Sequence, residues 1–493
     1  MSKQPVQKRF TILHSNDIHG DFQEEVVDGK PGKMIGGLAR LSGYINKVRK
    51  EEKNVLYLIA GDMVCGSMID TEFKGASTME LMNYLSPDAA TIGNHELDYG
   101  LYHLLFLEKM ANFPIVVSNL YIKNFHKRLM QPYVILNVDG FDILIIGIIT
   151  EEIMSNLKMD ADIGSFLSLE DASSEVGRIC DTYKDDDIDL TILLTHVGFE
   201  ADKKLAAMLK PEWGVDLMIG GHSHTILEQP EVVNNILITQ AGIGTDQLGR
   251  FDILVDDDTN SIVDWKWELL PVDETLAEPD EKLQGFIDSF QDVVDRKYNT
   301  IITRFAKRLD HLVWGAESEL GNLFADILAE HSKADIAFIS SGSIRGGGLG
   351  ETVTLGDFKK ICPYSGALQV VTLTGAQIKS IFNFTLTAEK RKRLIFQISK
   401  GWEVTYEDGK GVVGMKFNGK EVEDTDQHSV CLQEYYYKNS ERKMNIPKAD
   451  LIANGTNNVA TSFVEVIEEY LRNNQNLDRE VEGRIVVKQA VMG

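Results

Sequence analysis

The chain of 493 residues has only four cysteines, and they lie far apart in the sequence: Cys65, Cys180, Cys362 and Cys431. No two of them form the C-x-x-C pair of a zinc ribbon, and they are too few for the dense pattern of a disulfide framework. We therefore expect reduced thiols packed in the protein core. Long apolar runs are also missing, since none approaches the roughly 20 residues that a membrane span needs. This absence argues against a membrane partner.

Basic residues are in deficit, with 50 Lys and Arg against 75 Asp and Glu, for a net charge of −25. Such a surface repels a nucleic-acid duplex or an anionic membrane, so we expect neither as a partner. A small anionic substrate would need local positive charge.

The first ten residues, "MSKQPVQKRF", run into the first predicted strand without the apolar segment of a secretory signal. We expect a cytoplasmic protein.

The first half of the chain repeats one arrangement: an apolar run, a polar turn with glycine, and a stretch with helical periodicity. The runs are "FTILHSN", "NVLYLIAGD", "AATIGNHE", "FDILIIGIIT", "DLTILLTH" and "VDLMIGGHSH". Five of these six have Asp, Asn or His as one of their last two residues, and the exception ends near Thr150. In α/β sheets ligands bind outside the carboxyl ends of the strands. The pattern predicts an α/β domain with a polar site at that edge.

The second half follows a different pattern. From Pro279 to Tyr298, apolar residues spaced at three and four predict an amphipathic helix that links two domains. Beyond it, Thr374 and Gln377 form a capping box that begins a helix, and strands and hairpins follow. We predict an α/β domain over residues 1–275, a linker helix over 276–300 and a separate α+β domain over 301–493.

The polar strand ends provide candidate metal ligands. Asp17 and His19 are two residues apart, so their side chains point the same way if the strand continues, and the same holds for His222 and His224. The complete candidate set is Asp17, His19, Asp62, Asn94, His196, His222 and His224. These oxygen and nitrogen donors are too many for one zinc ion, and they include no thiolate. They suit two divalent cations, which we expect to be Mn, Mg, Zn or Fe.

A pair of such metals predicts phosphate chemistry. Two ions about 3.5–4 Å apart clamp a phosphoryl group and lower the pKa of a bridging water, so that hydroxide forms near neutral pH and attacks phosphorus. The leaving group then needs a proton. His95 follows a candidate ligand, and Asp98 lies three residues further on, where it can orient the imidazole and favour its cation. We predict that His95 is the general acid and that Asp98 supports it.

The motifs "NDIHGD", "GD", "GNHELD", "LLTH" and "GGHSH", in this order, resemble those of the calcineurin-like metallophosphoesterases, and the whole chain resembles the two-domain 5′-nucleotidase family. The resemblance implies two mixed sheets packed as a sandwich, flanked by helices, with the metals at one edge. It also implies one metal on Asp17, His19, Asp62 and His224. The second metal would then bind Asp62, Asn94, His196 and His222, with His95 and Asp98 as the acid dyad.

The family's second domain binds the nucleoside, and here the resemblance is less complete. The loop "SSGSIRGG" keeps Gly342 and Arg345, which with Asn94 are the expected phosphate contacts. Phe396 fits the motif of the first ring that stacks on the base. The loop that carries the second ring is replaced by "YYYKNSERKM", where one of three tyrosines could substitute.

The expected function is therefore hydrolysis of nucleoside 5′-monophosphates or related small phosphate esters by a dimetal-dependent phosphohydrolase. One alternative is a phosphodiesterase or phosphatase for a cyclic nucleotide or a non-nucleotide ester, which the altered loops favour. The alternative of another class is a sensor that binds metal and ligand without catalysis. The pair His95 and Asp98 argues against the sensor, because metal binding alone does not require an acid pair.

Overall fold

The computed structural model describes residues 6–27, 32–122, 127–150, 165–166, 168–364, 366–392, 394–453 and 455–489. The chain divides into two compact units, Met1–Val294 and Asp295–Gly493, and each is described by itself. Among the helices described, none is both long and apolar enough to cross a bilayer.

The first unit contains two mixed sheets. The five-stranded sheet has the order β16-β15-β1-β4-β5, in which β1, β4 and β5 run parallel. Its strands are β1 (Gln7–Ser15), β4 (Val55–Ala60), β5 (Ala89–Thr91), β15 (Gln247–Asp256) and β16 (Ser261–Pro271). The six-stranded sheet has the order β13-β14-β12-β11-β9-β8, with a parallel centre and antiparallel edges. Its strands are β8 (Tyr133–Val138), β9 (Phe141–Ile149), β11 (Leu190–His196), β12 (Val215–Ile219), β13 (Glu231–Val233) and β14 (Ile236–Thr239).

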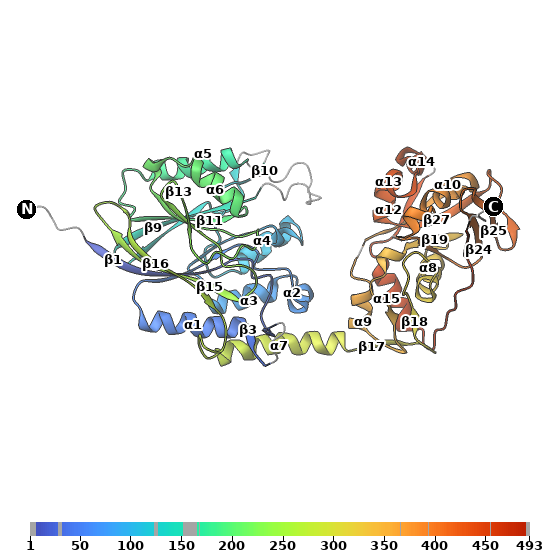
Figure 1. The fold of residues 1–493 in the computed structure, drawn as a ribbon, viewed down its shortest axis with the longest axis horizontal. Coiled ribbons are helices and arrows are strands. Elements are labelled where there is room, and N and C mark those ends of the chain that lie inside the picture. Colours follow the sequence, from blue (N-terminus) through green and yellow to red (C-terminus); the bar gives the residue numbers. More distant parts are fainter. Residues whose placement is uncertain are drawn as a thin grey trace, which may run out of the picture. The chain divides into compact units, whose positions relative to one another are not determined.

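The two sheets face each other across one apolar core, and helices cover their outer faces (Figure 1). Because side chains alternate along a strand, Ile192 and Leu194 of β11 point into the layer between the sheets, while Leu193 points outward. Leu193 packs in the layer beneath α5 (Leu169–Thr182) and α6 (Phe199–Met208). Burying each such side chain contributes about 1.5–3 kcal/mol. The predicted sandwich of two mixed sheets flanked by helices is confirmed.

Shorter elements complete the first unit. They are β2 (Glu24–Val26), β3 (Met34–Gly36), α1 (Leu38–Glu51), α2 (Met68–Phe73), α3 (Ala76–Leu85), η1 (His95–Leu97), α4 (Leu101–Met110), β6 (Leu120–Ile122), β7 (Lys127–Arg128), β10 (Ser165–Phe166) and η3 (Pro211–Trp213).

Helix α7 (Glu281–Tyr298) lies within the segment predicted as a linker helix, and the division between the units falls inside it. The carboxylate of Asp280 accepts the backbone N–H of Leu283 at 3.2 Å and caps the helix start. One face is apolar as the periodicity predicts: Leu283 and Ile287 are buried, and the ring of Phe290 lies 5.1 Å from that of Phe73 in α2.

The second unit is an α+β domain, as predicted. Its five-stranded sheet has the order β23-β19-β27-β22-β28, with one parallel pair, β19 and β27. The expected capping box of Thr374 and Gln377 begins α10. A second sheet has the order β26-β25-β24-β29. The helices are α8 (Glu319–Ser332), α9 (Leu355–Ile361), α10 (Gly375–Thr385), α11 (Ala388–Arg391), α12 (Glu434–Lys438), α13 (Ser440–Met444), α14 (Lys448–Ala453) and α15 (Phe463–Asn473), with the short turn η4 (Ser341–Ser343). The strands are β17 (Ile301–Arg304), β18 (Leu309–Asp310), β19 (Ile336–Ser340), β20 (Gly348–Leu349), β21 (Thr352–Thr354), β22 (Leu368–Thr374), β23 (Phe396–Ile398), β24 (Trp402–Glu407), β25 (Gly411–Phe417), β26 (Lys420–Glu421), β27 (Gln427–Gln433), β28 (Thr456–Ala460) and β29 (Ile485–Lys488).

Candidate metal centre

The seven predicted ligands lie at the carboxyl ends of five parallel strands, three in one sheet and two in the other. β9 supplies none, in line with the one apolar run that does not end in a polar ligand. By strand, the ligands are Asp17 and His19 after β1, Asp62 after β4, Asn94 after β5, His196 at the end of β11, and His222 and His224 after β12. Because the sheets pack face to face, these ends meet at one edge of the sandwich.

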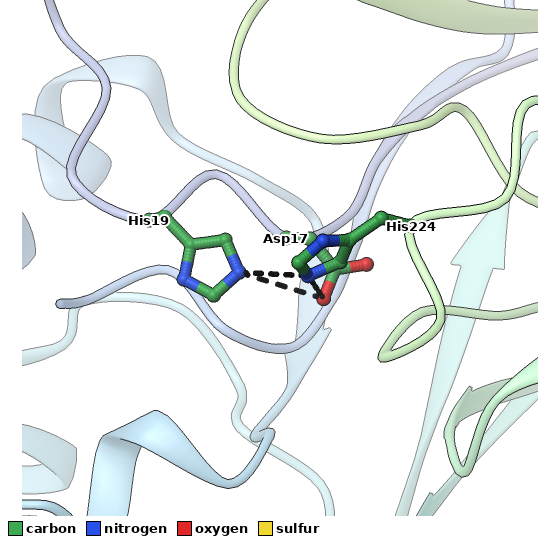
Figure 2. A group of neighbouring side chains, drawn as sticks. All are labelled: Asp17, His19 and His224. Carbon is green, nitrogen blue, oxygen red and sulfur yellow. Dashed lines mark hydrogen bonds and ion pairs between the residues drawn. The ribbon is translucent and has the colours of Figure 1, made fainter. Parts of the chain in front are cut away.

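One group of potential ligands consists of Asp17, His19 and His224 (Figure 2). The two imidazoles approach the carboxylate from different sides, with their Nε2 atoms 3.9 Å (His19) and 3.5 Å (His224) from Asp17 Oδ1. The two Nε2 atoms are 3.1 Å apart. All three side chains thus turn one ligand atom toward a common point.

A second group consists of Asp62, His196 and His222. His196 Nε2 lies 3.0 Å from Asp62 Oδ2, and His222 Nδ1 lies 2.8 Å from the amide oxygen of Asn94. The two groups adjoin each other, since His19 Nε2 is 3.9 Å from Asp62 Oδ2. Asp62 therefore faces both groups, which is the position of a bridging carboxylate.

The charges in this cluster call for cations. The side chains of Asp17 and Asp62 are 0% and 2% exposed, and within the described residues only histidines lie at ion-pair distance from them. Burial lowers the pKa of His196, but the charges of Asp62 and Asp17 and the hydrogen bonds to Asp62 and to the Ala60 carbonyl together outweigh burial and raise this pKa to about 9. Buried carboxylates are costly without a cation or a proton. Nitrogen and oxygen donors without thiolate fit Mn, Mg, Zn or Fe.

The backbone at five of the seven ligands is left-handed, and not extended as the sequence pattern predicts. Strands β1 and β12 end at Ser15 and Ile219, before the ligands, so continued strand alternation does not align the side chains. Five ligands instead have positive φ: Asp17 (51°), His19 (52°), Asp62 (51°), His222 (81°) and His224 (52°). Each such residue costs on the order of 1–3 kcal/mol and persists where the surroundings enforce it. The tight turns, and not extended strands, direct these side chains inward.

Close packing at the centre depends on glycine at two positions. A Cβ atom on Gly93 would lie 2.1 Å from Asp62 Oδ1, and one on Gly221 would lie 2.6 Å from the carbonyl oxygen of Ala60. Side chains there would displace the ligand turns.

Backbone carbonyls orient two of the imidazoles. His196 Nδ1 lies 2.8 Å from the carbonyl oxygen of Ala60, and His19 Nδ1 lies 3.2 Å from that of Cys65. An N–H that donates to a carbonyl fixes the tautomer in which Nε2 keeps its lone pair. Both Nε2 atoms are the ones that face the carboxylates.

Three buried polar residues that support the ligand turns were missed by the sequence analysis: Asn16, Glu96 and Asp202. The Glu96 carboxylate accepts backbone N–H groups of Asp62, Met63, Val64 and Gly93 at 2.6–3.2 Å. Burial raises the pKa of Glu96 to about 7. Its position inside "GNHELD", one residue after His95, was the only sequence pattern that could have drawn attention to it.

The predicted acid pair is in contact. His95 begins the turn η1, and its Nδ1 lies 2.6 Å from Asp98 Oδ2. This hydrogen bond is the main reason that the pKa of His95 is raised to about 11. The backbone N–H of His95 donates to Asp62 Oδ1 at 2.8 Å, so the pair is tied directly to the ligand cluster.

The predicted substrate residues Gly342 and Arg345 lie in the second unit, at and just after η4. The Gly342 N–H donates to Ser340 Oγ at 3.2 Å. The Arg345 guanidinium carbon lies 5.2 Å from the ring centre of Trp314 and 5.0 Å from that of Tyr364, and the guanidinium donates to the Tyr364 hydroxyl. Tyr364 is 48% exposed, and it was not singled out from the sequence.

Phe396 does not lie where a stacking ring is expected. It is 2% exposed, and its ring packs 5.2 Å from Phe338 and 4.8 Å from Tyr436. The prediction that it contacts substrate finds no support here, because strand β23 pairs with β19 and turns this side chain into the core. The three tyrosines of "YYYK" lie on helix α12 and not on a strand. Tyr435 is 51% exposed, Tyr437 is half-buried and Tyr436 is buried.

Comparisons with known proteins agree with this architecture. Residues 10–225 match the family Calcineurin-like phosphoesterase, and residues 302–446 match the family 5'-nucleotidase, C-terminal domain. The chain is 29% identical over 480 residues to a 5'-nucleotidase-related protein of Glossina morsitans morsitans, covering 88% of this chain and 84% of that protein. It is 28% identical to the 5'-nucleotidase of Mus musculus, covering 76% of this chain and 71% of that protein.

Longer relatives and solved structures extend the comparison. The Trifunctional nucleotide phosphoesterase protein YfkN of Bacillus subtilis is 29% identical over 80% of this chain, but the match spans only 29% of that longer protein. The crystal structure of a 5'-nucleotidase precursor from Thermus thermophilus covers 98% of this chain and 99% of its own, with a TM-score of 0.60 and 23% identity. This likeness concerns the fold.

The two-sheet sandwich, with its ligands at the strand ends, defines the first unit as a calcineurin-like metallophosphoesterase domain. Together with the second unit, it places the chain in the two-domain 5′-nucleotidase family of metal-dependent phosphoester hydrolases.

Proposed function

We propose that this protein hydrolyses small phosphate monoesters, with nucleoside 5′-monophosphates as the main candidates, at a centre that binds two divalent cations. The observation that carries the proposal is the position of Asp62, which faces both ligand groups while its Oδ1 accepts the backbone N–H of His95. One carboxylate thereby connects the cation ligands with the proton donor.

The ligands divide as the family resemblance implies. Asp17, His19, Asp62 and His224 would hold one cation, and Asp62, Asn94, His196 and His222 the other. Bound cations supply charge stabilisation for a phosphoryl group and a lowered pKa for a coordinated water.

The protein's own groups then act on the leaving group. The hydrogen bond to Asp98 keeps the His95 imidazole protonated at neutral pH, so that it can donate a proton to the departing oxygen. With 36% of its side chain exposed, His95 is accessible to a substrate.

For the rest of the substrate we propose the second unit, with Arg345 as the anion contact, and we replace Phe396 by the exposed ring of Tyr364. A guanidinium can bind a phosphate through two hydrogen bonds, and the neighbouring Tyr364 offers an exposed aromatic face. Because the family's second ring loop is replaced, a non-nucleotide or cyclic ester remains the second candidate.

A panel assay tests the proposal. The protein, stripped with chelator and reloaded with Mn²⁺, is offered nucleoside 5′-monophosphates, sugar phosphates, cyclic nucleotides and aryl mono- and bis-phosphate esters. We expect turnover of monoesters that depends on added metal, with the highest kcat/KM on nucleotides. Turnover of the diesters alone would favour the second candidate, and no turnover of any ester would favour a sensor. The cytoplasmic location stays a prediction, to be checked by cell fractionation.

A further inference from the structure

A cysteine thiol lies against the acid pair. Cys65 Sγ donates a hydrogen bond to Asp98 Oδ2 at 3.0 Å, and His95 Nδ1 lies 2.6 Å from the same oxygen. One ligand atom from each of the three residues lies within 4.8 Å of those of the other two. Neither phosphate hydrolysis nor the seven-ligand cluster has a use for this thiol.

The direction of the thiol is set by the backbone. Cys65 has a left-handed φ of 75°, a conformation that non-glycine residues rarely adopt. Its N–H donates to Asp70 Oδ2 at 2.8 Å, and its carbonyl oxygen lies 3.2 Å from His19 Nδ1. Asp70 is fully buried, so it is a firm anchor for this turn. The contacts of its backbone N–H and C=O therefore hold Cys65 in place, with the side chain directed toward Asp98.

The cluster is also accessible from solvent. The side chains of His95 and Asp98 are 36% and 42% exposed, and Cys65 is half-buried. The other three cysteines are buried. Cys65 is thus the thiol of this chain that an ion from solution can reach.

We propose that Cys65, His95 and Asp98 form a third metal site, which takes a thiophilic divalent cation such as Zn²⁺ or Cd²⁺ and thereby inhibits the hydrolase. The donors are one sulfur, one nitrogen and one oxygen, with a fourth position open to water, and thiolate selects such ions over Mg²⁺ and Mn²⁺. On binding, the thiol proton passes to solvent and the metal–sulfur bond replaces the hydrogen bond to Asp98.

The inhibitory half of this inference rests on the proposed function. A cation on His95 Nδ1 releases to solvent the proton that this atom shares with Asp98 and leaves a neutral, metal-bound imidazole, which is a poor proton donor. Inhibition should therefore be stronger for an ester with a poor leaving group than for an aryl phosphate with an acidic phenol. A thiophilic ion that instead replaced the catalytic metals would slow both substrates alike.

The test follows Cd²⁺ binding to the Mn²⁺-loaded full-length protein, through the ultraviolet thiolate-to-cadmium charge-transfer band and through Cd and Mn contents by elemental analysis. We expect one Cd per chain beyond the retained Mn, with a band that Cys65→Ser abolishes and Cys180→Ser keeps. The Cd²⁺ concentration that halves activity, with each variant normalised to its own rate in the absence of Cd²⁺, should rise at least about tenfold in Cys65→Ser.

An unchanged band in Cys65→Ser, or loss of Mn equal to the Cd bound, would overturn the site. Equal sensitivity of wild type and Cys65→Ser to Cd²⁺ would overturn the inhibitory role. The band needs no turnover, so the two proposals fail separately. A protein that hydrolyses no ester but shows a Cys65-dependent band keeps the third site and loses the inhibitory role together with the proposed function.

Discussion

The metal centre of the first unit and the arginine loop of the second differ in how their side chains are held. Asp17 and Asp62 are almost fully buried, and the ligands lie at or just after the ends of strands from two sheets that share one core. Arg345 follows a short turn, and its guanidinium rests between Trp314 and Tyr364, whose ring is half exposed. The first site is fixed by the fold, whereas the second depends on local contacts between loop side chains.

This difference predicts that mutations in the two regions have different effects on metal content and on substrate binding. A change at the buried centre removes a charge that its neighbours were arranged around, so metal content and turnover should fall together. A change at the loop removes one exposed contact, so binding should weaken while the metals stay. Mutations in the two regions therefore test this division.

Asp62→Asn should lose at least one metal and at least about 10⁴-fold in kcat, because the carboxylate that faces both ligand groups is gone and several kcal/mol of charge stabilisation go with it. Elemental analysis and kcat on an aryl phosphate measure the two effects. Asp139→Asn is the matched control, since Asp139 is 62% exposed and pairs only with Lys8 among the described residues. Full metal content in Asp62→Asn would break the division.

His95→Asn should keep its metals but lose rate by roughly 10²–10⁴-fold on a nucleoside monophosphate, the range that general acids contribute. The loss should be smaller for an aryl phosphate with an acidic phenol, which departs without a proton. His103→Asn is the control, as this histidine contacts the carbonyl oxygen of Lys74 outside the ligand cluster. Equal losses on both substrates would contradict the role as proton donor.

Much of the fold was predictable because buried apolar residues recur in the sequence at the period of a strand or a helix. Apolar runs followed by Asp, Asn or His marked the parallel strands, and Thr374 and Gln377 marked a helix start. The ligand set could be proposed because polar residues interrupt this apolar pattern at the strand ends. The left-handed turns at Asp17 and His19 could not be predicted, because Asp and His adopt positive φ more often than most residues but still do so in only a small minority of cases.

What the sequence did not predict are contacts made across turns. Glu96 accepts N–H groups from the turn after β4, more than thirty residues away, and the Cys65 thiol meets Asp98 at a separation of 33. Phe396 shows the converse ambiguity, since an aromatic residue in "IFQIS" fits a core strand as well as a ligand loop. Only pairing with β19 decides between these interpretations.

Arg345→Ala should raise KM for a nucleoside monophosphate by about 10–100-fold, because a hydrogen bond to a charged group contributes roughly 1.5–3 kcal/mol. Metal content should not change, since the residue lies in the other unit. Steady-state kinetics with elemental analysis separates the two. Arg472→Ala, a surface residue of α15 that pairs with Glu468, serves as the control. A loss confined to kcat would show that Arg345 acts on the transition state and not on substrate binding.

The smallest effect on activity should come from Phe396→Leu, compared with Tyr364→Leu. Phe396 is a core residue, so its replacement should lower the free energy of unfolding by about 1 kcal/mol and leave KM within about twofold. Tyr364 is 48% exposed and touches Arg345, so its replacement should raise KM several-fold with a stability change within about 0.5 kcal/mol. Denaturant unfolding and nucleotide kinetics measure both variants. If Phe396→Leu raised KM more than Tyr364→Leu did, the Phe396 ring would have to leave the core to contact the substrate. That result would contradict the assignment of Phe396 to the core and of Tyr364 to the substrate.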